Sequence, residues 1–82
     1  MIMLSQKNCP KCRVLEEYLK MGLNDRYVND IEVVMREDDE KRFMKYARKH
    51  GIMATPALIA GDYVLHSPSN EDTLKFLEKL IQ

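Results

Sequence analysis

The chain has 82 residues, of which 45% are hydrophobic, and its thirteen basic and thirteen acidic side chains cancel to a net charge of zero. A chain of this length forms one domain, so we expect a single unit over residues 1–82. The balanced charge argues against nucleic acid as a partner, because affinity for phosphates depends on accumulated lysine and arginine. The sequence also lacks an apolar run of about 18 residues and a charged leader, so we expect no membrane partner, no signal peptide and a cytoplasmic location.

The first half of the chain predicts strand, helix and strand. Ile2 to Gln6 is a short apolar run typical of a buried strand. Apolar residues then recur on one helical face from Pro10 to Met21, and Gly22 ends that pattern. Leu23 to Arg26 is expected to form a polar turn. Tyr27 to Met35 is rich in β-branched residues and predicts a second strand.

A second helix and a hairpin follow. The acidic run Glu37–Glu40 precedes a helical pattern with a basic end and a stop at Gly51, which is the charge order that the helix dipole favours. Two short apolar runs, Ala57–Ala60 and Tyr63–His66, are separated by a Gly-Asp turn and predict a β-hairpin.

The last helix is expected over Asn70 to Ile81, with Ser69 and Asp72 spaced as a capping box. The element order is therefore β-α-β-α-β-β-α. A four-stranded mixed sheet with helices on both faces is the simplest way to bury all three apolar helical stripes. This α/β arrangement is the thioredoxin fold.

The only two cysteines form the motif Cys9-Pro10-Lys11-Cys12 where the first strand gives way to the first helix. A C-x-x-C motif in a β-α-β pattern predicts a redox pair. Pro10 suits the first helical position, which places Cys9 at the N-terminal cap, where unpaired N–H groups and the helix dipole favour a thiolate. Lys11 and Lys7 add positive charge nearby, and we expect both to tune the reactivity of Cys9.

Together with Thr55-Pro56 at the start of the hairpin, this motif makes the chain resemble the glutaredoxins and the small thioredoxin-like redoxins over nearly its full length. The resemblance implies that Pro56 is a cis-proline beside the disulfide, that Cys9 is the attacking thiol and that Cys12 resolves the mixed disulfide. We further expect the backbone around Thr55 to bind an extended substrate segment by strand addition.

The resemblance also implies an enzyme: a dithiol-disulfide oxidoreductase that donates electrons to reductive enzymes and contributes to cell redox homeostasis. Its expected partners are disulfide-containing proteins, with ribonucleotide reductase as one candidate, and we expect a monomer with no bound cofactor. The reductant is left open between glutathione and a thioredoxin-reductase-type enzyme. Glutathione-using members usually have a tyrosine where Lys11 stands and a basic residue where Gln6 stands.

A different class of function is a non-catalytic module that holds zinc or an iron–sulfur cluster through the cysteine pair. A complete zinc site has four ligands, and the further candidates His50 and His66 lack the usual ligand spacing. We therefore predict no metal site within one chain, while a site shared between two molecules stays open. An inert buried cysteine pair is a further alternative, as are a solvated Lys11 and an ordinary strand entry at Thr55-Pro56.

Overall fold

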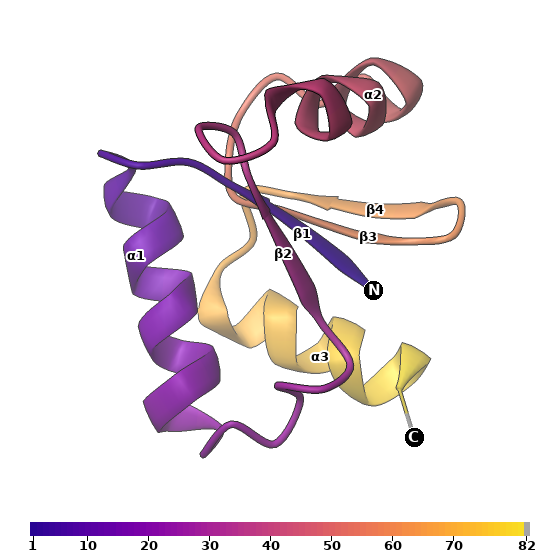
Figure 1. The fold of residues 1–82 in the computed structure, drawn as a ribbon. Coiled ribbons are helices and arrows are strands. Elements are labelled where there is room, and N and C mark those ends of the chain that lie inside the picture. The colour runs from indigo at the N-terminus through magenta and orange to yellow at the C-terminus, as the bar shows by residue number, and fades with distance from the viewer. Residues whose placement is uncertain (82) are drawn as a thin grey trace.

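The computed structural model describes residues 1–81 and consists of one four-stranded sheet between helices (Figure 1). The strands are β1 (Ile2–Ser5), β2 (Glu32–Met35), β3 (Ala57–Ala60) and β4 (Tyr63–His66), and the helices are α1 (Pro10–Glu17), the π-helical turn η1 (Tyr18–Gly22), α2 (Glu40–His50) and α3 (Asn70–Leu80). Within residues 1–81, no helix has the length and apolar character needed to cross a bilayer.

The sheet is mixed, as the sequence predicted. Its strand order is β2-β1-β3-β4, with β1 parallel to β2 and both other pairings antiparallel. Helices α1 and α3 cover one face and α2 covers the other (Figure 1). This is the thioredoxin fold, so the expected fold class is confirmed.

Side-chain alternation along the central strand β1 builds the core on both faces of the sheet. Met3 packs with Leu15 and Leu58 on the face that α1 covers. Its neighbour Leu4 packs on the opposite face with Phe43 of α2. Because β1 is buried on both sides, its sequence is a continuous apolar run instead of an alternating one.

The helix ends follow the predicted signals. The Asp39 side chain accepts a hydrogen bond from the Arg42 N–H at 3.2 Å and so caps α2, which ends at Gly51 in the left-handed conformation, with φ 63°. The Ser69 hydroxyl likewise accepts from the Asp72 N–H at 3.1 Å at the start of α3. These bonds satisfy donors that have no partner within the helix.

The first helix differs from the prediction at its C-terminal end. The α-helical pattern stops at Glu17, and a wider π-helical turn continues to Gly22, with the Leu23 N–H bonded to the Tyr18 carbonyl at 2.9 Å. A Cβ at Gly22 would lie 2.6 Å from the Tyr18 ring, so this close turn requires glycine. Residues 23–26 form a turn, as expected, but Leu23 is 7% exposed and belongs to the core, so the expected polar character was wrong at that residue.

The predicted strand from Tyr27 to Met35 was too long, since only Glu32–Met35 is a strand. The preceding residues form successive turns, in which the Asp30 and Ile31 N–H groups both bond to the Tyr27 carbonyl. Tyr27 is buried against Leu77 of α3. Tyr27 is therefore apolar because it packs in the core. A pattern of apolar residues alone does not distinguish this role from a place in a strand.

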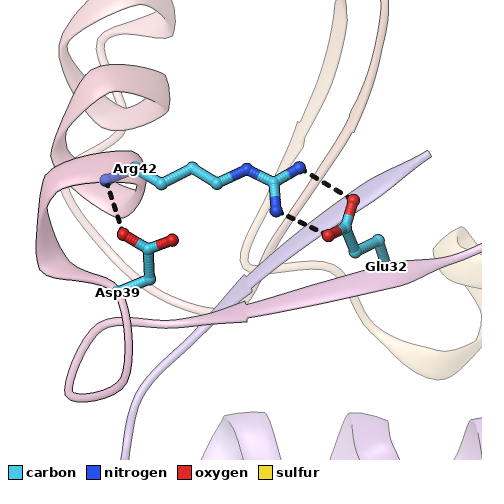
Figure 2. Close-up of polar contacts among 3 residues, drawn as sticks. All are labelled: Glu32, Asp39 and Arg42. Carbon is cyan, nitrogen blue, oxygen red and sulfur yellow. Dashed lines mark hydrogen bonds and ion pairs between the residues drawn. The ribbon is translucent and has the colours of Figure 1, made fainter.

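An ion pair joins the edge strand β2 to α2 (Figure 2). Both terminal guanidinium nitrogens of Arg42 donate to the carboxylate of Glu32, one of them over 2.8 Å. The hydrogen bonds from Arg42 hold the pKa of Glu32 below its ordinary value of 4.5 and raise the pKa of Arg42 further above its usual range. The pair links α2 to β2, and its exposure to solvent limits its contribution to stability.

This lowered pKa predicts an acid-sensitive stability. A group whose pKa is depressed by folding contributes stability above its unfolded pKa, and that contribution is lost as pH falls through the folded pKa. We expect Glu32→Gln to be slightly less stable than the parent at pH 7 and to lose less stability between about pH 5 and pH 3. Thermal unfolding across that range measures the effect. Arg42→Gln should mimic it, and the double variant should show little further change. Strictly additive effects would contradict a direct pairing.

Candidate active site

The two cysteines form a disulfide at the N-terminus of α1. Cys9 is the N-terminal cap and Pro10 is the first helical residue, as predicted. One helical turn brings the Cα of Cys12 to 5.2 Å from that of Cys9. The Cys12 N–H donates to the Cys9 sulfur over 3.2 Å. This N–H lies in the first turn of α1, where backbone donors have no partner within the helix.

The two sulfurs differ in accessibility. Cys12 is only 1% exposed, whereas Cys9 is partly exposed at the surface. A molecule arriving from solution therefore reaches Cys9 first. The asymmetry fits an attacking Cys9 and a resolving Cys12, the roles expected from the sequence.

The segment before β3 lies against the disulfide. The Thr55–Pro56 peptide bond is cis, as the resemblance implied. The Thr55 hydroxyl oxygen lies 3.4 Å and its carbonyl oxygen 3.7 Å from the Cys9 sulfur. The fold therefore brings Thr55 to Cys9, 46 positions away in the sequence.

Some backbone groups of the segment Thr55–Pro56 already have hydrogen-bond partners within the protein. The Pro56 carbonyl accepts the Ser67 N–H at 2.9 Å, and this bond ties it to the end of the hairpin. No backbone–backbone bond from Thr55 occurs among those that residues 1–81 make outside helices and strands. Met53 is 97% exposed just upstream. Substrate binding by the Thr55 backbone stays a prediction, with an accessible apolar side chain beside it.

Gln6 is a site residue whose structural role the sequence did not reveal. It follows the last residue of β1, and its side-chain amide donates to the Thr55 hydroxyl oxygen over 2.8 Å. The sequence marks Gln6 only as the residue where related proteins carry a basic side chain. No sequence signal links it to Thr55, because the contact depends on how the loop before β3 returns to the end of β1.

The two lysines near the cysteine pair are both exposed to solvent. Lys11 is exposed at the second helical position and Lys7 is exposed in the loop that follows β1. The Lys7 N–H donates to the Glu37 carboxylate at 3.0 Å, and this bond holds the pKa of Glu37 below its ordinary value of 4.5. This contact involves the backbone of Lys7 and not its ammonium group. Tuning of Cys9 by either lysine remains a prediction.

Two hollows flank the disulfide. A groove of about 630 Å³ runs between the start of α1 and the loop before α3, and its lining includes Pro10, Lys11 and Pro68. A smaller hollow of about 250 Å³ lies on the other side and includes Cys9, Gln6 and Glu16. Only the smaller hollow is lined by Cys9, and the larger groove begins at Pro10, the residue after it.

Within residues 1–81, the structure does not place further metal ligands around the cysteine pair. Over residues 1–81, no group of three or more histidine, cysteine, aspartate or glutamate side chains is placed to hold an ion. The cysteine pair would therefore supply two ligands, and a tetrahedral zinc would need two more from elsewhere.

The site consists of a partly exposed cysteine at a helix cap, a buried partner one turn later and a cis-proline loop that faces them. These features define a thioredoxin-fold protein with a redox-type cysteine pair. The family model described as "Thioredoxin domain" matches residues 1–82, and the chain belongs to this family. Neither the search of curated proteins nor the search of solved structures gave a match. The fold and the cysteine pair support a thiol–disulfide oxidoreductase.

Proposed function

We propose that this protein is a glutaredoxin-like dithiol–disulfide oxidoreductase that reduces protein or small-molecule disulfides. The observation that carries the proposal is the asymmetric pair, with Cys9 accessible at the N-terminus of α1 and Cys12 buried beside it. The thiolate is the attacking form of cysteine, and the helix cap is where thiolates are stabilised.

The reaction consists of two exchanges. The Cys9 thiolate attacks one sulfur of the substrate disulfide, and the electron pair of the broken bond leaves on the other sulfur, which takes up a proton. Cys12 then loses its proton and attacks the Cys9 sulfur of the mixed disulfide, which releases the second substrate thiol and closes the Cys9–Cys12 bond. In total, two electrons and the proton of Cys12 pass from the protein to the substrate, and solvent supplies the second proton because Cys9 starts as a thiolate.

Stabilisation of the Cys9 thiolate helps the reaction mainly when Cys9 is the leaving group. An ordinary cysteine is only about 3% ionised at pH 7, so stabilising the thiolate raises the attacking fraction by at most about thirtyfold. Nucleophilicity falls with basicity at a slope of about 0.4–0.5, which cancels most of that gain for a large shift. The same stabilisation makes Cys9 a better leaving group when its own disulfide is broken, and there no such cancellation occurs.

The test of the proposal is reduction of insulin by the pre-reduced protein, followed as precipitation of the insulin chains. The expected result is a rate clearly above that of dithiothreitol alone. Metal analysis of protein purified without oxygen tests the alternative metal-binding module. Stoichiometric zinc or iron together with no reductase activity would overturn the enzymatic proposal.

The proposed physiological reductant is a thiol such as glutathione or a thioredoxin-reductase-type enzyme. Reduction of the oxidised protein by each donor separately distinguishes them, with free thiols as the readout. As clients we propose disulfide-containing proteins, with ribonucleotide reductase as a candidate. A monomer in the cytoplasm, with no bound cofactor, is the expected working state.

A further inference from the structure

A chain of polar contacts leads from the end of β1 to the accessible sulfur. The Gln6 side-chain nitrogen lies 2.8 Å from the Thr55 hydroxyl oxygen, and that oxygen lies 3.4 Å from the Cys9 sulfur. Thr55 is 9% exposed and Gln6 is partly buried, so water competes little for the hydroxyl. Gln6 and Thr55 are 49 positions apart in the sequence, so this series of contacts forms only in the folded protein.

The direction of these hydrogen bonds is fixed by the chemistry of the groups. A threonine hydroxyl has one proton and can also accept, while the amide nitrogen of Gln6 can only donate. Cys9 carries no hydrogen in its disulfide, so the Thr55 hydroxyl is the donor across the 3.4 Å contact. With its oxygen occupied by Gln6, the hydroxyl keeps its proton free for the sulfur.

The position of this proton affects the two states of reduced Cys9 in opposite ways. A thiolate at Cys9 accepts from the Thr55 hydroxyl and from the Cys12 N–H, which lies 3.2 Å away. A protonated thiol can instead donate to the Thr55 carbonyl oxygen at 3.7 Å. A hydroxyl whose proton faces the sulfur therefore favours the thiolate, and hydrogen bonds to charged groups are the stronger ones.

We propose that Gln6 is a positioning residue for thiol–disulfide exchange, which holds the Thr55 hydroxyl with its proton directed at the Cys9 sulfur. This inference rests on the proposed function and deepens it. In the forward step the hydroxyl stabilises the attacking Cys9 thiolate. In the reverse step, when a thiolate attacks the substrate sulfur bonded to Cys9, it stabilises Cys9 as the leaving group.

The experiment measures the rate of Cys9 alkylation by iodoacetamide against pH in the reduced full-length protein, with the modified cysteine identified by mass spectrometry. Gln6→Met keeps the length of the side chain but removes its donor, and it should raise the midpoint of the profile by about half to one pH unit. Gln6→Glu should raise it further, because a carboxylate accepts the threonine proton and adds a negative charge.

A double-mutant cycle with Thr55→Val separates this role from a merely structural one. Without the hydroxyl, Gln6→Met should leave the midpoint where Thr55→Val has placed it. Thr55→Ser keeps a hydroxyl and should preserve the effect of Gln6→Met. An unchanged midpoint in the single Gln6→Met variant, or an equal shift in the Thr55→Val background, overturns the proposal. If the Gln6 variants fail to fold, equal midpoints for Thr55→Val and Thr55→Ser overturn it instead.

Alkylation needs neither a client nor turnover, so the two proposals fail separately. A coupled shift in a protein that does not reduce insulin would overturn the proposed function and keep the role of Gln6. Full reductase activity with no coupling between Gln6 and Thr55 would do the reverse.

Discussion

Replacing Cys9 with serine is expected to reduce disulfide reduction to the rate of the protein-free control. An alcohol oxygen cannot form the mixed disulfide, and the remaining thiol of Cys12 is only 1% exposed to an incoming substrate. The measurement is insulin reduction with equal amounts of parent and Cys9→Ser protein. Thermal unfolding of both under reducing conditions shows whether the loss has a structural origin.

The Cys12→Ser variant is the matched control for that loss. Cys9 still attacks in this variant, but the internal thiol that would release the product is absent. We expect a stable mixed disulfide with the substrate, seen as an added mass that disappears on treatment with dithiothreitol. Trapping by Cys9→Ser in place of Cys12→Ser would reverse the assigned roles, and parent-like activity of Cys9→Ser would refute the mechanism.

Replacing Leu15 with alanine should cost about 2.7–5 kcal/mol, the range found for fully buried leucines. Leu15 is 1% exposed and packs with Met3 and Leu58, so the change leaves a cavity where α1 rests on the sheet. A domain of this size has a total stability of about 4–12 kcal/mol. The midpoint of urea unfolding, measured with the disulfide intact, should therefore fall steeply.

The neighbouring Val14 provides the control. It is 56% exposed on the same helix, and Val14→Ala should change stability by no more than about 0.5 kcal/mol. Equal losses in the two variants would mean that α1 is not anchored through Leu15. Since Cys9 and Cys12 are carried by the start of α1, loss of this anchor should also loosen the geometry of the pair.

Local signals in the sequence were sufficient for much of the fold. The glycine-aspartate turn and its two flanking runs predicted the hairpin Ala57–Ala60 and Tyr63–His66 with the bounds that the structure has. Pro10 at the first helical position placed Cys9 at the cap. These features depend on backbone chemistry within a few residues, which the sequence states directly.

The misjudged regions depend on tertiary packing. The apolar residues Leu23 and Tyr27 were expected in a polar turn and a strand, yet they close one end of the core against α3. In the sequence, an apolar residue that packs against a helix cannot be distinguished from one that belongs to a strand.

The candidate site shows the same division. The cysteine motif and Thr55-Pro56 could be identified as local motifs, and the resemblance placed them together. The contact of Gln6 with Thr55 spans 49 positions and leaves no local pattern. The contact between Glu37 and the Lys7 backbone N–H was equally hidden, because Glu37 lies beyond the end of β2.

The central claim, that Cys9 and Cys12 form a reversible intramolecular redox pair, is tested most directly by a redox titration. The protein is equilibrated in buffers of reduced and oxidised dithiothreitol or glutathione, its free thiols are alkylated, and the species are counted by mass. We expect one two-electron transition, with the ratio of dithiol to disulfide changing tenfold per about 30 mV and independently of protein concentration. A transition that depends on protein concentration, or a pair that stays in one state across all buffers, would contradict it.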